Sequence, residues 1–174
     1  MKKQFLCSCL ALVTGMGAGY AINAIGQVNQ RQAASGEDVI KARVNFMEED
    51  IGREWKVLAN FAKNGKGSLA EVEKSANALV ALAKKIPGHF PKDTGRGNFP
   101  DDATRALPEI WKDTKGFEKA INHFAGESAK LASLAKAGDK EAVVNLIGTS
   151  GSYAKSLIGC NDCHESFRGA RVKK

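Results

Sequence analysis

Residues 68–86 read SLAEVEKSANALVALAKKI, and this stretch carries the clearest secondary-structure signal in the 174-residue chain. Ser68 precedes an apolar run and Glu71 follows three residues later, which is the pattern of a capping box at the start of a helix. Apolar residues then recur at steps of three and four up to Ile86, and Pro87-Gly88 ends the pattern. The stretch therefore predicts an amphipathic helix with one buried face.

The segments on either side of this helix repeat the same spacing. A first helix is predicted from Ser35, which can form a capping box with Asp38, to the turn at residues 64–67. A third helix is predicted to begin near Pro108, because proline suits the first helical turn, and to end at Gly138. Between the second and third helices, residues 87–107 form a long irregular connection, which is unusual unless it has a function such as covering a site.

A fourth helix is predicted from about Lys140 to Phe167, although three glycines lie inside it: Gly148, Gly151 and Gly159. Interior glycine costs about 1 kcal/mol relative to alanine, and either a flat cofactor close to the helix backbone or fraying would account for it. No strand alternation is visible after residue 24. The sequence thus predicts an all-α, antiparallel up-down-up-down four-helix bundle.

Residues 1–24 have the organisation of a secretory signal. Lys2 and Lys3 precede an uncharged apolar stretch, and small residues at Ala21 and Ala24 suit cleavage. The alternative is an uncleaved membrane anchor, since weakly polar residues continue through Ile25 and Val28. We therefore predict a signal peptide over residues 1–24, export to the bacterial periplasm, and one domain over residues 25–174.

The charge balance excludes one class of partner. The chain carries a formal charge of +7, which falls to +5 when Lys2 and Lys3 leave with the signal. The positive residues are spread along the helices instead of forming a run, which argues against nucleic-acid binding and permits steering toward an acidic partner.

The motif Cys160-Asn161-Asp162-Cys163-His164 carries the chemistry, because C-x-x-C-H is the signature of c-type haem attachment. Residues i, i+3 and i+4 share one face of a helix, so both sulfurs can bond to one porphyrin edge while the imidazole reaches its iron. The other cysteines, Cys7 and Cys9, lie in the leader, so no disulfide framework is expected.

Two other uses of the motif are a redox C-x-x-C pair and half of a zinc site. A thioredoxin-like pair requires a sheet and a helix start, whereas this motif lies late in an all-helical chain. Zinc requires a fourth ligand, and neither His89 nor His123 belongs to a recognisable ligand pair. One covalently attached haem c therefore remains the expected cofactor.

Residues 160–168 read C-x-x-C-H-x-x-F-R at the end of a helical chain, and this placement resembles the cytochrome c prime family and its six-coordinate relatives. The resemblance extends over nearly all of residues 36–170 and includes Arg43-x-x-x-Met47 and the stretch ALPEIW at 106–111. It implies a four-helix bundle with the haem lodged among the helices, and often a homodimer packed through the first two.

The resemblance also assigns roles to the first helix. The fourth residue after the early arginine faces the vacant side of the iron, and here it is Met47. A thioether opposite His164 would give a low-spin iron suited to electron transfer, whereas an unligated Met47 would leave the iron five-coordinate. Arg43 is placed near a haem propionate, with a solvated surface position as the alternative. His123 is a distal ligand only if Met47 fails.

Two further residues complete the predicted site. Phe46 either walls the distal pocket or packs between helices, and Arg168 either stays near the proximal side or ends the helix favourably.

The leading expectation is a one-electron carrier that exchanges electrons with redox proteins. The alternative is a protein that binds nitric oxide or another diatomic gas. Enzymatic activity is not expected, because no distal acid–base pair is evident.

Overall fold

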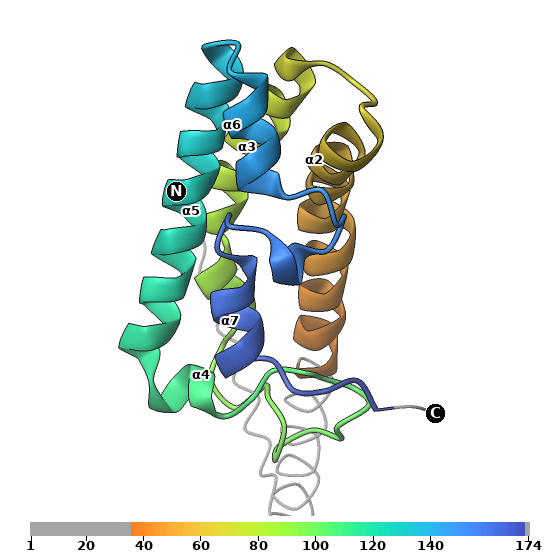
Figure 1. The fold of residues 1–174 in the computed structure, drawn as a ribbon. Coiled ribbons are helices and arrows are strands. Elements are labelled where there is room, and N and C mark those ends of the chain that lie inside the picture. Colours follow the sequence, from red (N-terminus) through yellow and green to blue (C-terminus); the bar gives the residue numbers. More distant parts are fainter. Residues whose placement is uncertain (1–35, 173–174) are drawn as a thin grey trace, which may run out of the picture. The chain divides into compact units, whose positions relative to one another are not determined.

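The computed structural model describes residues 36–172, and these form helices joined by turns and loops, with two isolated β-bridges and no strand. Four helical segments run alternately up and down, so the predicted all-α, up-down-up-down bundle is confirmed (Figure 1). None of the helices within residues 36–172 is both long and apolar enough to cross a bilayer. The predicted signal peptide and the capping residue Ser35 lie outside the described residues.

The first helix is continuous but not uniform. Residues 36–45 are α-helical, η1 (Phe46–Ile51) is a π-helical segment, and α2 (Gly52–Asn64) is α-helical again. Gly65 ends α2 with a left-handed φ of 63°, which confirms the predicted stop. The hydrophobic spacing did not predict the π-helical segment, a feature that is frequent at functional sites.

The second helix begins as its capping residues predict, and the third begins at Pro108, also as predicted. In α3 (Leu69–Ala83) the Ser68 side chain accepts from the Glu71 N–H, and the Glu71 carboxylate accepts from the Ser68 N–H. The chain then forms the short 3₁₀ helix η2 (Ile86–His89). The third helix is split into α4 (Glu109–Lys112) and α5 (Thr114–Lys136) at Asp113, whose carboxylate accepts from the Gly116 N–H.

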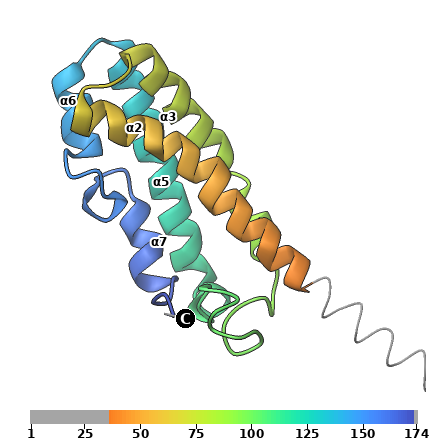
Figure 2. The same ribbon diagram turned by 90° about the vertical axis from the view of Figure 1, so that its right-hand side faces the viewer.

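The prediction of one long fourth helix is wrong. The chain forms α6 (Lys140–Ile147), the 3₁₀ turn η3 (Tyr153–Lys155) and α7 (Cys160–Ser166) instead. All three glycines adopt left-handed backbone angles, with φ of 81° at Gly148, 69° at Gly151 and 81° at Gly159, which an α-helix cannot accommodate. Figure 2 shows α6 and α7 following one another along the same side of the bundle.

Gly159 also permits a close approach of the backbone to α5. A Cβ atom at this position would lie 3.1 Å from His123 Nδ1 and 3.1 Å from the backbone nitrogen of Phe124. The turn that begins α7 therefore lies directly against α5, which sets the position of the C-x-x-C-H motif relative to the bundle.

The core lies between the four helical segments. Its fully buried side chains come from α2, α3, α5, α6 and the turn before α7, and they are Leu58, Val72, Leu79, Ser128, Leu131, Val143, Ile147 and Ile158.

The 87–107 connection is held by the side chain of Arg43, which is only 4% exposed. Its guanidinium donates to the Thr94 carbonyl at 2.7 Å, the Thr94 hydroxyl at 3.0 Å and the Thr104 hydroxyl at 2.8 Å. A longer bond of 3.4 Å reaches the His89 carbonyl, and the Phe90 ring centroid lies 4.9 Å from Arg43 Cζ. Burial lowers the pKa of Arg43 to about 10, still far above neutral pH.

The same connection is bonded to the segment that follows α7. The Leu107 N–H donates to the Phe167 carbonyl at 3.1 Å, and the Gly169 N–H donates to the Arg105 carbonyl at 2.8 Å. The connection thus joins the first helix, through Arg43, to the chain immediately after the haem motif.

The first prediction concerns the turn at Gly159. We expect Gly159→Ala to lower the free energy of unfolding by about 1–2 kcal/mol, because alanine disfavours a left-handed φ. Gly126→Ala is the matched control, since an added Cβ there meets nothing within 4 Å inside α5. It should raise stability by up to about 1 kcal/mol. Urea denaturation of the purified variants tests this, and equal shifts at both glycines would contradict it.

The second prediction concerns the buried guanidinium. We expect Arg43→Met to lower the free energy of unfolding by about 3 kcal/mol, because the loop hydroxyls and carbonyls would lose charge-assisted donors. The control is Arg53→Met, since Arg53 is exposed and pairs with Asp50 and Glu54 on the same helix. That change should stay within about 0.5 kcal/mol in the same urea titration. A comparable loss in both variants would contradict a structural role for Arg43.

Candidate functional site

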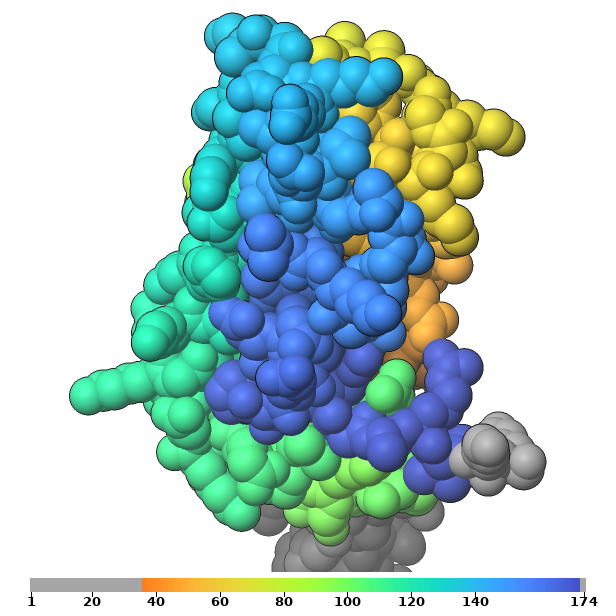
Figure 3. Space-filling view, in the orientation of Figure 1, coloured from red at the N-terminus to blue at the C-terminus, as the bar shows by residue number. Residues whose placement is uncertain are grey.

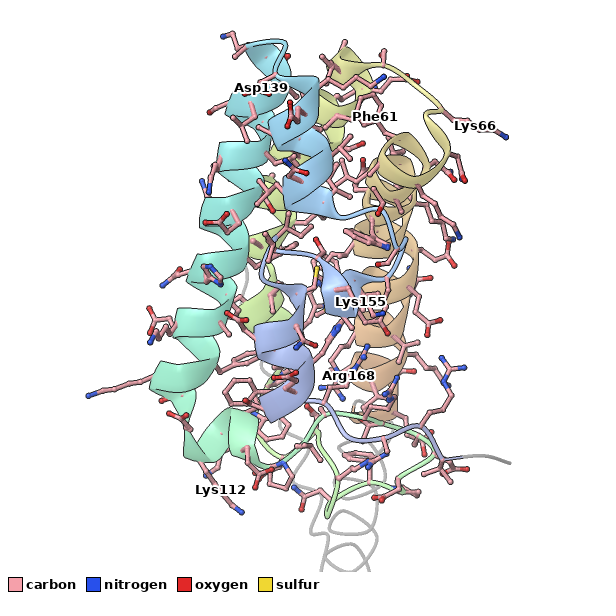
Figure 4. All side chains as sticks on the ribbon, in the orientation of Figure 1. Phe61, Lys66, Lys112, Asp139, Lys155 and Arg168 are labelled. Carbon is pink, nitrogen blue, oxygen red and sulfur yellow. The ribbon has the colours of Figure 1, made fainter. Side chains whose placement is uncertain are left out.

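The short helix α7 positions the three residues of the motif. Cys160 is its first residue, and Cys163 and His164 follow one turn later, so the predicted helical placement of the motif is confirmed. Both thiols are free and pack against the hydrophobic core, while His164 is half-buried. Figure 4 shows α7 with its side chains in front of the bundle, and labels Arg168, which lies in the segment that follows α7.

The environment of the thiols distinguishes between uses of the C-x-x-C pair. Burial, followed by the neighbouring Cys163, raises the pKa of Cys160 to about 12. Burial, followed by the charge of Asp162, raises the pKa of Cys163 to about 11. A catalytic redox pair needs a thiol whose pKa is lowered, so this pair is not activated for disulfide exchange. Two neutral, core-facing thiols on one helical face suit covalent attachment of a flat group.

His164 has the form that an iron ligand needs. Burial, followed by the positive charges of Arg168 and Arg105, lowers the pKa of His164 to about 4, so the imidazole is neutral at pH 7. Its Nδ1 atom is buried and makes no hydrogen bond to any described residue. A buried polar atom without a partner requires an explanation, and an imidazole that holds a metal within a bound cofactor provides one. The residues therefore fit a haem.

Tyr153 is a site residue that the sequence analysis did not single out. Its ring meets the His164 ring edge-on, with 4.8 Å between the centroids and 77° between the planes. Its hydroxyl accepts a hydrogen bond of 3.1 Å from the guanidinium of Arg168. A continuous fourth helix would not bring these groups together, so no pattern in the sequence could have identified them. Arg168 lies beyond the end of α7 at Ser166 and is linked to His164 through Tyr153, and its position on the proximal side of a haem stays a prediction.

His123 lies on α5 and is directed to the motif from outside. Its Nδ1 atom is 2.7 Å from a carboxylate oxygen of Asp162, and both side chains are about half exposed. Within residues 36–172 no three His, Cys, Asp or Glu side chains are arranged to hold a metal ion. The pair connects α5 to α7.

The residues assigned to the distal side lie in or beside the π-helical segment. Phe46 is buried and stacks on the His89 ring, with 3.9 Å between the centroids, which fits the reading in which it packs between segments. Met47 is half-buried and packs against the core, as do Ile51 and Trp55. Contact of Phe46 or Met47 with a haem stays a prediction.

Arg43 corrects one expectation and leaves another open. The reading of a solvated surface arginine is wrong, because the side chain is buried and four hydrogen bonds hold it to the 87–107 connection. A contact with a haem propionate stays a prediction.

Comparisons with known proteins identify the family of the chain. The profile of the family described as Cytochrome C' matches residues 38–168. Cytochrome c' of Allochromatium vinosum is 28% identical over 166 residues, which cover 95% of this chain and 98% of that protein.

Two solved structures show the same fold. Cytochrome c' from Rhodobacter sphaeroides has a TM-score of 0.63 and 29% identity, over 78% of this chain and 98% of that one. A second cytochrome c', described as having an unusual ligand-controlled dimer dissociation, has a TM-score of 0.60 and 25% identity, over 78% of this chain and 97% of that one. The chain therefore belongs to the cytochrome c' family and is a haem c protein.

Proposed function

We propose that this chain is a haem protein that binds a diatomic gas, such as nitric oxide, on the side of the haem that faces the first helix. Cys160 and Cys163 hold the haem covalently in this proposal, and His164 binds its iron. Membership of the cytochrome c' family supports the proposal, as does the relative in which a ligand controls dimer dissociation.

The apolar character of the first helix is the observation that carries this proposal. Phe46, Met47 and Ile51 belong to the core-facing side of η1, and none of them has a protonatable group. Such a wall excludes water and offers a small neutral molecule an apolar environment. It lacks the acid–base groups that peroxidase-like chemistry needs, so we propose binding and not catalysis.

The remaining residues act on the proximal side. The bound haem supplies an iron centre that can change oxidation state and hold a ligand. His164 presents a neutral imidazole nitrogen, and its ring is packed edge-on against Tyr153. Arg168 holds the Tyr153 hydroxyl and places a fixed positive charge near the imidazole. That charge should favour the ferrous over the ferric state by simple electrostatics.

A second candidate function is one-electron transfer with Met47 as the sixth ligand. It is favoured by the position of Met47 in a π-helical turn, where the backbone departs from the regular helical register. Imidazole and thioether form an established axial pair that raises the potential of haem iron. Redox partner proteins would then be the physiological partners.

Location and assembly follow from the same proposals. The leader predicted at residues 1–24 would deliver the chain to the periplasm, where it would be free or tethered by an uncleaved leader. A homodimer packed through the first two helices is implied by the family. Val44, an exposed apolar residue on the first helix, supports such an interface.

The attachment site can be tested by extraction of the pigment. We expect haem to stay with the denatured polypeptide in acid acetone, because thioether bonds survive unfolding. The Cys160→Ala/Cys163→Ala variant should release all its haem into the solvent, whereas Met47→Leu should retain it. Absorbance of the two fractions is the measurement, and a colourless wild-type polypeptide expressed with a haem maturation system would overturn the proposal.

The two functions can be separated by absorption spectra of ferric and ferrous protein. For gas binding we expect high-spin spectra that Met47→Leu leaves unchanged, with carbon monoxide binding at a rate proportional to its concentration. For electron transfer we expect low-spin spectra that Met47→Leu abolishes, with a binding rate that saturates because Met47 must first dissociate. The second pattern would contradict gas binding to a vacant iron position.

A further inference from the structure

Four arginines lie around the segment that follows the haem motif, and we call them the arginine surface: Arg96, Arg105, Arg168 and Arg171. Arg105 donates from Nε to the Gly169 carbonyl at 2.8 Å, and Arg96 donates to the Ala170 carbonyl. These bonds hold two arginines of the 87–107 connection against the backbone that carries the other two. The cluster is therefore built by the fold from residues more than sixty positions apart.

The positive charges of this surface are only partly balanced. The Asp101 carboxylate is 3.7 Å from a guanidinium nitrogen of Arg96, and Asp102 is exposed beside it in the sequence. Burial, followed by the positive charges of Arg168 and other arginines of the surface, lowers the pKa of Arg105. Four guanidiniums face these two carboxylates, so the arginine surface carries a net positive charge.

Exposed apolar side chains lie along the same part of the chain. Leu157 is 65% exposed, Val172 is 45% exposed and Tyr153 is 36% exposed, although each is large and apolar. Tyr153 contacts Arg168 directly, with Arg168 Cζ 5.2 Å from the Tyr153 ring centroid. Lys155 and Arg168 are labelled on one face in Figure 4, and Figure 3 shows that residues 150–172 form much of that face. Arginine and tyrosine beside apolar residues are typical of protein interfaces.

The cleft between α5 and α7 has the opposite character. Its lining includes four carboxylates, those of Glu109, Asp113, Asp162 and Glu165. The basic side chains in the lining are one lysine, Lys119, and one histidine, His123. The helix that carries the motif thus lies between a cationic surface and a largely acidic cleft. An approaching charged protein would be oriented by this asymmetry before contact.

We propose that the arginine surface docks an acidic patch of an electron-transfer protein beside α7, so that electrons reach or leave the haem from this side. The inference rests on the proposed haem attachment at α7, but not on whether Met47 binds iron. A one-electron carrier must exchange electrons with a partner protein, and a gas such as carbon monoxide binds only ferrous iron, whereas the neutral gas ligand itself makes no use of four arginines. Association should be fast at low ionic strength and should slow as salt is added.

Two small redox reagents of opposite charge test the surface. The haem-loaded ferrous protein would be oxidised by ferricyanide, an anion, and separately by tris(phenanthroline)cobalt(III), a cation, in a stopped-flow instrument. We expect Arg105→Gln/Arg171→Gln to slow the ferricyanide reaction about three- to tenfold at low ionic strength and to leave the cobalt reaction unchanged or faster. Salt should remove most of the difference. A peptide of ten glutamates should inhibit the ferricyanide reaction of wild type but not of the variant.

The matched control is Lys112→Gln/Lys130→Gln, which removes the same charge from exposed lysines of α4 and α5. It should change the ferricyanide rate much less. Arg105→Lys/Arg171→Lys should restore the wild-type rate. If the double glutamine variant folds poorly, the single variant Arg171→Gln replaces it, because Arg171 is exposed, and it should show part of the slowing. The reduction potential of each variant should also be measured, because it distinguishes a change in the driving force of the reaction from a change in the rate of encounter.

Three results would overturn the docking proposal: equal slowing in the control, no slowing in the arginine variants, or inhibition by the peptide in every variant. Absence of covalent haem would instead overturn the proposed function, and it is detected by absorbance before any kinetic measurement. A Met47→Leu protein with the same charge dependence as wild type would show that docking is independent of the sixth ligand.

Discussion

The contact between Gly159 and α5 is the constraint on which the site depends. A left-handed turn at this residue lets the backbone approach His123 and Phe124 without a side chain in between, and α7 begins from that point. Cys160 and Cys163 consequently pack against the core, where burial keeps their thiols neutral. The His123–Asp162 contact joins the same two helices at the surface. A longer, unbroken helix would place the motif differently and could not bring Tyr153 onto His164.

A second constraint joins the two sides of the predicted haem environment. Arg43 lies one turn before Met47 and donates to Thr94 and Thr104, and the connection that contains them is bonded in turn to the segment after Phe167. A displacement of the first helix can therefore be transmitted to the segment after α7 through these hydrogen bonds. A buried guanidinium needs several neutral oxygens at once to satisfy its donors. This need explains why the 87–107 connection is ordered around the Arg43 side chain.

Family membership establishes a haem c protein, and the choice between gas binding and electron transfer depends on a single coordination position. In both proposals the polypeptide contributes in the same way beside His164, through a neutral imidazole, a packed tyrosine and a fixed arginine. In these proposals the difference lies at the π-helical turn Phe46–Ile51, which contains Met47, the proposed sixth ligand. The proposed docking at the arginine surface serves electron transfer directly, and it also serves binding of any gas that needs ferrous iron.

The sequence by itself determined the helical class, the cap at Ser68, the stop at Gly65 and the helical placement of the motif, because each depends on residues three or four positions apart. It also singled out Arg168, which the structure places just after the end of α7 and in contact with Tyr153. Only the tertiary structure decided that the fourth helix breaks at three glycines, that Arg43 is buried in a connection some fifty residues away, and that Tyr153 and four arginines meet near α7. Such contacts join distant residues through backbone angles and burial, which a periodic pattern of apolar residues does not encode.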